Sequence, residues 1–228
     1  MPGTLPPTAP PRKHRVFVVD DHPIVRQGLA LLINQEADLV VCGEAEEGRS
    51  VPDALARLQP DVLVLDISLP GPDGIELLKQ IRLTDPALPI LVLSMHDESV
   101  YAERALRAGA NGYIMKQEAT ERVLVALRRI LRHEVYVSDR FANEVLHQIG
   151  AGPTKARSAS VASLSDRELE VFCLIGDGYA TRQIADALHL SVKTVESYQA
   201  HIKEKLALPS GRALMQRAIE WRLSEKTT

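Results

Sequence analysis

Five polar side chains stand where short apolar runs end in the first half of the chain: Asp20, Asp21, Asp66, Ser94 and Lys116. The runs are nearly continuous and rich in β-branched residues, which is typical of strands buried on both faces of a sheet. If such strands are parallel, their carboxyl ends lie along one edge, where open α/β sheets bind ligands. The joint placement of these five residue types therefore predicts one ligand site.

The residue types at this edge indicate the chemistry of the ligand. Three clustered carboxylates repel one another, so the site favours a hard divalent cation with oxygen ligands, most naturally Mg²⁺. Lys116 can pair with an anion held there, and the hydroxyl of Ser94 can donate to one of its oxygens. A single aspartate at a strand end is more often a helix cap, and Asp20 could cap the helix that follows. The five residues together favour the cation site.

The elements that position these groups alternate along the chain. Five strands are predicted at 15–19, 39–42, 61–65, 90–94 and 112–115, and five helices at 24–33, 50–58, 75–82, 99–107 and 119–132. Five successive strand–helix units predict an α/β fold with a doubly wound parallel sheet and right-handed crossovers.

The pattern changes in the second half of the chain. One more helix is possible at 139–149, and Gly, Pro and small polar residues from 150 to 160 predict a linker. Four helices are then predicted, at 166–176, 181–188, 192–206 and 211–223. Ser165 and Glu168 match a capping box at the start of the first of them. A small all-α domain therefore follows the α/β domain.

Two of these helices have the helix-turn-helix plan, in which the second helix enters the major groove of DNA. Ser191 is a natural N-cap for that second helix. Its inward stripe carries Val195, Ile202 and Leu206, and a different face carries Lys193, Glu196, Ser197 and Ala200. An apolar strip on the last helix either closes the small core or joins two such modules.

Composition sets limits on the setting of the protein. The 228 residues carry a formal net charge of −3, with an acidic excess in 14–134 and balanced charges in 163–228. Two cysteines cannot make a disulfide framework or a four-ligand zinc site. No apolar run approaches the roughly 18 residues that span a bilayer, and residues 1–13 lack the apolar region of a secretory signal. We therefore expect a cytoplasmic protein without a membrane partner.

The segments VFVVDDHPIVRQGL, VLVLDISLPGPDGIELL, ILVLS and ANGYIMK resemble the receiver domain of two-component response regulators, over about residues 14–132. The resemblance implies a flavodoxin-like sheet and phosphorylation of Asp66 by a sensor histidine kinase or a small phosphodonor. It implies that Mg²⁺ binds Asp21 directly, Asp20 largely through water, and Asp66 and the backbone carbonyl of Ser68 as further ligands.

The same resemblance assigns the residues that respond to the phosphate. Ser94 and Lys116 would hold the phosphoryl oxygens, and Tyr113 matches the switch aromatic that turns inward when Ser94 moves. On spacing alone, Tyr113 reads as a half-buried strand tyrosine. Gln117 stands where many receivers carry proline. A phosphorylated receiver is expected to favour a homodimer through the helix 99–107, the strand 112–115 and the helix 119–132, or to release the helical module.

The string LSDRELEVFCLIGDGYATRQIADALHLSVKTVESYQAHIKEKLAL resembles the LuxR-type helix-turn-helix, over about residues 163–224. With a receiver in front, the combination resembles the NarL/FixJ class of transcriptional regulators that bind double-stranded DNA. The resemblance implies base contacts from Lys193, Glu196, Ser197 and Ala200, and phosphate contacts from Thr194, Tyr198, Lys203 and Lys205. A module without net charge should bind DNA weakly alone, so two copies are expected to act together.

The chain is thus expected to comprise a disordered Pro-rich tail at 1–13, a receiver at 14–134, a linker at 135–162 and a DNA-binding domain at 163–228. We expect no enzymatic activity other than the receiver's own phosphorylation and dephosphorylation. Two alternatives stay open at this point. One is a Mg²⁺-dependent phosphatase, although Ser68 stands where such enzymes usually carry a second acid. The other is a binding protein whose receiver docks partners without phosphate.

Overall fold

The computed structural model of the chain describes residues 12–69, 74–96, 98–151, 160–188 and 190–227. Residues 1–11 of the expected tail and residues 152–159 of the expected linker lie outside the described residues. No helix in the described part of the chain combines the length and the apolar character that crossing a bilayer requires.

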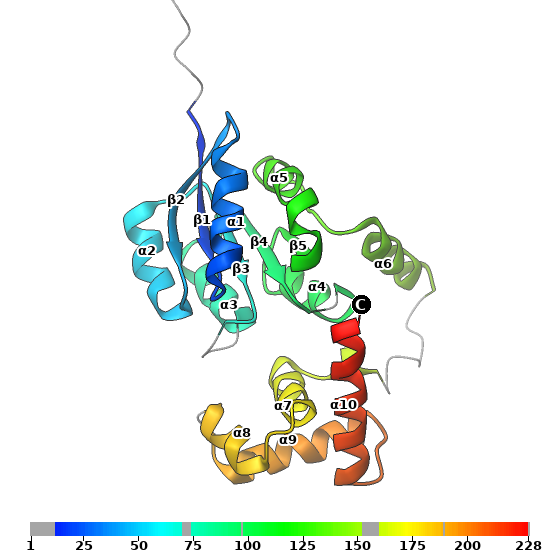
Figure 1. The fold of residues 1–228 in the computed structure, drawn as a ribbon. Coiled ribbons are helices and arrows are strands. Elements are labelled where there is room, and N and C mark those ends of the chain that lie inside the picture. Colours follow the sequence, from blue (N-terminus) through cyan, green and yellow to red (C-terminus); the bar gives the residue numbers. More distant parts are fainter. Residues whose placement is uncertain (1–11, 70–73, 97, 152–159, 189, 228) are drawn as a thin grey trace, which may run out of the picture.

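A five-stranded parallel sheet forms the centre of the first domain (Figure 1). Its strands are β1 (His14–Val19), β2 (Leu39–Ala45), β3 (Val62–Asp66), β4 (Ile90–Ser94) and β5 (Gly112–Met115). They lie in the order β2-β1-β3-β4-β5, and every neighbouring pair is parallel. This order is the flavodoxin-like one, whose switch point between β1 and β3 is where ligands bind. The predicted doubly wound sheet is confirmed.

Helices cover both faces of this sheet (Figure 1). One face carries α1 (Pro23–Asn34) and α5 (Ala119–Ile130), and the other carries α2 (Val51–Leu58), α3 (Gly74–Thr84) and α4 (Glu98–Arg107). Residues 16–19 of β1 are continuously apolar because both faces of the sheet are covered at this strand. Val16 and Val18 pack on the face covered by α1 and α5, and Phe17 and Val19 pack on the face covered by α2, α3 and α4.

The beginning of the expected linker is a packed part of the receiver. The backbone N–H of Tyr113 on β5 donates to Tyr136 O at 2.9 Å, and Tyr136 N–H donates to Asn111 O at 2.9 Å. The helix α6 (Asp139–Ala151) then places Phe141, 6% exposed, in the receiver core. Residues 136 to 141 of the expected linker therefore pack against the receiver, because Tyr136 pairs with β5 and Phe141 enters the receiver core.

The second domain is all-helical, as predicted. A short 3₁₀ turn, η4 (Val161–Ser163), leads into α7 (Asp166–Gly176), α8 (Thr181–Ala187), α9 (Val192–Lys205) and α10 (Gly211–Thr227). The capping box at the start of α7 is confirmed, because Ser165 Oγ accepts from Glu168 N and a Glu168 carboxylate oxygen accepts from Ser165 N. These helices enclose a separate apolar core that includes Phe172, Val195 and Trp221.

Candidate functional site

The carboxyl edge of the sheet gathers the predicted polar residues. Asp20 directly follows β1, and Asp66 and Ser94 are the last residues of β3 and β4. All three are at most 1% exposed. Asp21 lies at the rim of the same edge, with its side chain 28% exposed. Parallel strands bring these residues together from distant positions in the sequence, as the pattern predicts.

Lys116 is the cation that compensates the buried carboxylates. It follows β5 in the short turn η2 (Lys116–Glu118), and its side chain is 5% exposed. Its Nζ donates to Asp66 Oδ2 at 2.7 Å and lies 2.7 Å from Asp20 Oδ2, which is an ion pair without hydrogen-bond geometry. Buried carboxylates need such partners, because an unpaired buried charge is strongly destabilising.

The surroundings of Asp66 also affect its acidity. Burial raises the pKa of the Asp66 carboxyl above its usual value, although the hydrogen bonds from Lys116 and from the Ser68 backbone oppose the rise. Ser68 N donates to Asp66 Oδ1 at 2.7 Å. The carboxylate oxygens are therefore held by directed donors in a site where water does little to stabilise their charge.

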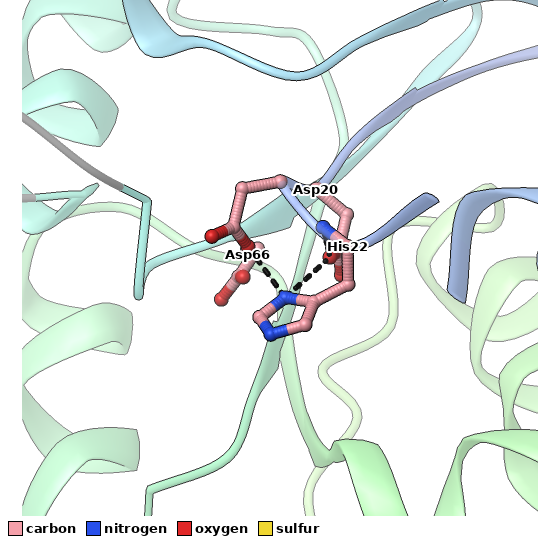
Figure 2. A group of neighbouring side chains, drawn as sticks. Asp20, His22 and Asp66 are labelled. Atoms are coloured by element: carbon pink, nitrogen blue, oxygen red, sulfur yellow. Dashed lines mark hydrogen bonds and ion pairs between the residues drawn. The ribbon is translucent and has the colours of Figure 1, made fainter. Parts of the chain in front are cut away.

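The acidic edge fits a divalent cation. One ligand atom each from Asp20, Asp21, His22 and Asp66 lies within 4.8 Å of the others, and Figure 2 shows the His22 ring beside the carboxylates of Asp20 and Asp66. Asp21 Oδ1 is buried and, among the described residues, accepts no hydrogen bond. Such an oxygen among several carboxylates is the kind of ligand that hard cations prefer.

Two of the residues predicted to respond to the phosphate, Ser94 and Tyr113, both form hydrogen bonds with His96 in the loop after β4. Ser94 Oγ accepts from His96 N at 3.0 Å, and the hydroxyl of Tyr113 donates to His96 O at 2.8 Å. Tyr113 is 1% exposed, so the prediction of a half-buried strand tyrosine is wrong, and the ring already lies inward. The His96 carbonyl explains this position, because it provides the hydrogen-bond partner that a buried tyrosine hydroxyl needs.

From this loop a contact continues into the helical domain. The His96 ring stacks on Tyr101 of α4 with centroids 4.3 Å apart, and the Tyr101 hydroxyl lies 3.5 Å from Cys173 Sγ on α7. A cavity of about 580 Å³ lies between the strand edge and the helical domain, lined by both Met95 and Leu169. The two domains are thus in contact beside the acidic edge.

Charged groups strengthen this contact. Asp166, the first residue of α7, accepts from Lys79 Nζ at 2.8 Å and from Arg104 Nη1 at 2.9 Å. Arg104 also donates to the carbonyls of Ala162 and Leu164. Burial raises the pKa of the Asp166 carboxyl, but the hydrogen bonds from Lys79 and Arg104 outweigh it, so the pKa lies below its usual value.

The expected base-reading residues of α9 are all exposed in this arrangement. Lys193, Glu196, Ser197 and Ala200 face away from the buried Val195 and Ile202. The domain contact runs through α7 and η4, so it leaves this face open.

The expected phosphate-binding residues of α9 differ among themselves. Thr194 bonds the capping residue Ser191, with the two hydroxyls 2.7 Å apart. Tyr198 packs partly on the core, and Lys203 is half-buried. Lys205 Nζ lies 2.6 Å from Glu168 Oε2. Lys205 therefore compensates a buried carboxylate in this structure, and its phosphate contact stays a prediction.

Two groups in this region were not singled out from the sequence. His22 directly follows Asp21, and that adjacency was a usable signal for a nitrogen donor at the site. The Asp166 cluster carried no such signal, because Lys79 and Asp166 are 87 residues apart and meet only through the docking of the two domains.

Comparisons with known proteins agree with this architecture. The family model described as "Response regulator receiver domain" matches residues 16–128, and the model "Bacterial regulatory proteins, luxR family" matches residues 162–218. The oxygen regulatory protein NreC of Staphylococcus epidermidis is 35% identical over 216 residues, covering 92% of this chain and 99% of that protein. NreC of Staphylococcus aureus is 34% identical over 215 residues, with the same coverage.

Solved structures give the same result. RcsB from Salmonella enterica serovar Typhimurium, bound to the promoter rprA in the presence of the phosphomimetic BeF₃⁻, matches with a TM-score of 0.69 and 30% identity. That match covers 91% of this chain and 99% of RcsB. The chain belongs to the two-component response regulators that join a receiver domain to a LuxR-type helix-turn-helix domain. Within them it is a DNA-binding regulator of the NarL family.

Proposed function

We propose that Asp66 accepts a phosphoryl group from a sensor histidine kinase or a small phosphodonor, and that this controls transcription through sequence-specific binding to double-stranded DNA. The observation that carries the proposal is a fully buried Asp66 whose Oδ2 lies 2.7 Å from Lys116 Nζ, beside two further carboxylates. A DNA-binding regulator of this kind acts in the cytoplasm, where its DNA lies.

The residues around Asp66 suit phosphoryl transfer. An Asp66 oxygen attacks phosphorus, a P–O bond forms, and the bond to the donor's leaving atom breaks with its electron pair going to the donor. Lys116 and Ser94 then hold phosphoryl oxygens, with the lysine exchanging part of its contact to the carboxylates for the new anion. Mg²⁺ bound by Asp20, Asp21, Asp66 and the Ser68 carbonyl would neutralise the charge on the transferring group.

The reaction is confined to the receiver itself. The residue two positions after Asp66 is Ser68, so the second acid that phosphatases of this type use is absent from that position. We therefore assign only self-phosphorylation and self-dephosphorylation to the chain, and not turnover of an external phosphate ester.

The contact between the domains supports a route from phosphate to DNA. Ser94, His96 and Tyr101 form a continuous path from the edge of the sheet to Cys173 on α7. A shift of Ser94 toward a phosphate therefore weakens docking of the helical domain. The base-reading face of α9 is already exposed, so phosphorylation does not need to uncover it. We infer instead that phosphorylation releases the helical domain from the receiver, so that it can pair with a second copy.

The surface for pairing is assigned to α10. The receiver surface expected to form a dimer is partly covered in this structure, since Tyr136 lies along β5 and α7 contacts α4. On α10, Met215, Ile219 and Leu223 are between 38% and 60% exposed. Their spacing of four residues places them on one face of the helix. Two domains joined through this face would combine weak DNA affinities.

The test is the DNA affinity of the full chain with and without acetyl phosphate. We expect acetyl phosphate to phosphorylate the native chain and to tighten its DNA binding, and we expect neither effect in Asp66→Asn. The matched control is Asp53→Asn, because Asp53 is an exposed aspartate on α2 and should behave as the native chain does. Equal tightening in Asp66→Asn would show that Asp66 is not the switch.

A further inference from the structure

The segment that leaves the receiver is tied to β5 along its backbone. Tyr136 forms a parallel bridge with Gly112, and backbone hydrogen bonds join it to Tyr113 and Asn111. A Cβ built on Gly112 would lie 3.0 Å from Tyr136 O, so a side chain at residue 112 would crowd this pairing. From here the chain leads through α6 toward the helical domain.

A second contact joins the same segment to the start of α4. The carboxylate of Glu98, the first residue of α4, accepts from Ser138 N at 2.9 Å through Oε1 and from the Ser138 hydroxyl through Oε2. Ser138 Oγ in turn accepts from Phe141 N at 3.1 Å, in the first turn of α6. One carboxylate therefore holds the residue at which α6 begins.

This carboxylate depends strongly on Ser138. Glu98 is only 9% exposed, and it forms no ion pair within the described part of the chain. A mostly buried charge that loses its hydrogen-bond donors is costly, because little water is available to replace them. The contact is also sensitive to distance, since a hydrogen bond is lost beyond about 3.5 Å. A small displacement of the start of α4 is therefore enough to break it.

Glu98 lies close to the residues expected to respond to a phosphate. It stands two residues after His96, whose N–H donates to Ser94 Oγ and whose carbonyl accepts from the Tyr113 hydroxyl. When Ser94 turns toward a phosphoryl oxygen, its hydroxyl moves away from the His96 N–H. The loop that leads into α4 then shifts and carries Glu98 away from Ser138.

We propose that the contact of Glu98 with Ser138 is a latch that holds the start of the linker on the unphosphorylated receiver and opens when Asp66 carries a phosphoryl group. The inference rests on the proposed phosphorylation of Asp66. It adds a route through the covalent connection between the domains, beside the docking contact of α4 with α7. Because the latch stabilises only the unphosphorylated state, a phosphoryl group on Asp66 and an open latch favour each other equally.

The experiment measures amide hydrogen exchange of residues 136–151 in the full chain, with and without Mg²⁺ and BeF₃⁻ as a mimic of the phosphoryl group. Fluorine NMR titration measures the affinity for BeF₃⁻ independently. The variants are Glu98→Gln, which removes the charge, and Ser138→Ala, which removes the hydroxyl. The matched control is Glu121→Gln, an exposed glutamate in the first turn of α5.

We expect BeF₃⁻ to accelerate exchange in 136–151 of the native chain roughly 10–100-fold, the range that corresponds to hydrogen bonds with a charged group. Both latch variants should exchange faster without BeF₃⁻, change little when it is added, and bind it more tightly than the native chain does. Glu121→Gln should behave as the native chain.

The outcomes separate a latch from a static anchor. Bound BeF₃⁻ with unchanged exchange in 136–151 of the native chain would overturn the inference while the phosphorylation site stands. Latch variants with native affinity for BeF₃⁻ would overturn it too, because the contact would then stabilise both states alike. A native chain that binds no BeF₃⁻ would overturn the proposed phosphorylation site as well.

Discussion

Lys203 and Lys205, near the end of α9, carry the same charge but differ in their surroundings. Lys205 Nζ lies 2.6 Å from Glu168 Oε2, and that glutamate side chain is only 6% exposed. Burial raises the pKa of the Glu168 carboxyl, but hydrogen bonds from Lys205 and Ser165 outweigh it and the pKa lies below its usual value. Lys205 therefore stabilises the start of α7 within the domain, whereas Lys203 is the better candidate for a phosphate contact.

Substitution of each lysine by methionine separates these roles. Lys205→Met should lower the free energy of unfolding by about 1–2 kcal/mol, because the mostly buried Glu168 carboxylate loses its cationic partner. The loss is limited because the Lys205 side chain is itself partly exposed. Lys203→Met should leave stability unchanged, weaken binding to all DNA sequences alike and lower the salt slope by about one unit. Urea unfolding and DNA titrations at several salt concentrations measure both. A Lys205→Met chain of native stability would contradict the structural role.

At the level of elements, the start of α3 depends on a close backbone contact. A Cβ built on Gly74 would lie 2.3 Å from Ile67 Cα and 2.6 Å from Ile67 O. Ile67 directly follows Asp66, so α3 packs against the backbone that leaves the candidate phosphorylation site. A side chain at residue 74 must therefore push the start of α3 away from the Ile67 backbone.

We predict opposite effects of alanine at two helical glycines. Gly74→Ala should lower the free energy of unfolding by about 1–3 kcal/mol, because rigid backbone atoms must move. Gly28→Ala, within α1, meets nothing within 4 Å. It should raise stability by about 0.5–1 kcal/mol, since alanine loses less backbone entropy in a helix. Thermal unfolding of both variants tests this, and a neutral Gly74→Ala would show that the contact relaxes easily.

At the scale of the whole molecule, docking of the two domains depends on the charge of Asp166. Lys79 and Arg104 approach this carboxylate from α3 and α4 at 2.8 Å and 2.9 Å. Because the pKa of Asp166 is lowered from 3.8 in the docked state, its contribution to docking is fully present above pH 3.8 and is lost as the pH falls through the lowered value.

Small-angle scattering of the full chain should therefore detect an expansion as the pH falls below about 3.8, the usual value for this carboxyl. Asp166→Asn should already be more expanded at neutral pH and should change less on acidification. The DNA-reading face of α9 is exposed in the docked state, so this variant should keep its affinity for DNA per domain. An identical acid transition in both chains would assign the expansion to other carboxylates.

Much of this architecture could be predicted from the sequence, because it depends on local or periodic signals. Apolar runs specify strands and parallel strands place their ends on one edge, so the pattern alone groups Asp20, Asp66 and Ser94. The capping box of Ser165 and Glu168 and the helix-turn-helix spacing are likewise properties of neighbouring residues. These signals predict the fold class and the composition of the acidic edge, and the resemblance of the motifs to receiver and LuxR-type domains predicts the class of protein.

Only the tertiary structure decided which charges meet. Lys116 contacts two carboxylates, Lys205 turns to Glu168, and Asp166 reaches Lys79 across 87 residues of sequence. The packing of Tyr136 along β5 and the inward position of Tyr113 also depend on the final arrangement of elements. The physical reason is that an ion pair or a buried hydroxyl is specified by distances of a few ångströms between surfaces. Those distances are set by packing angles, on which sequence periodicity carries no information.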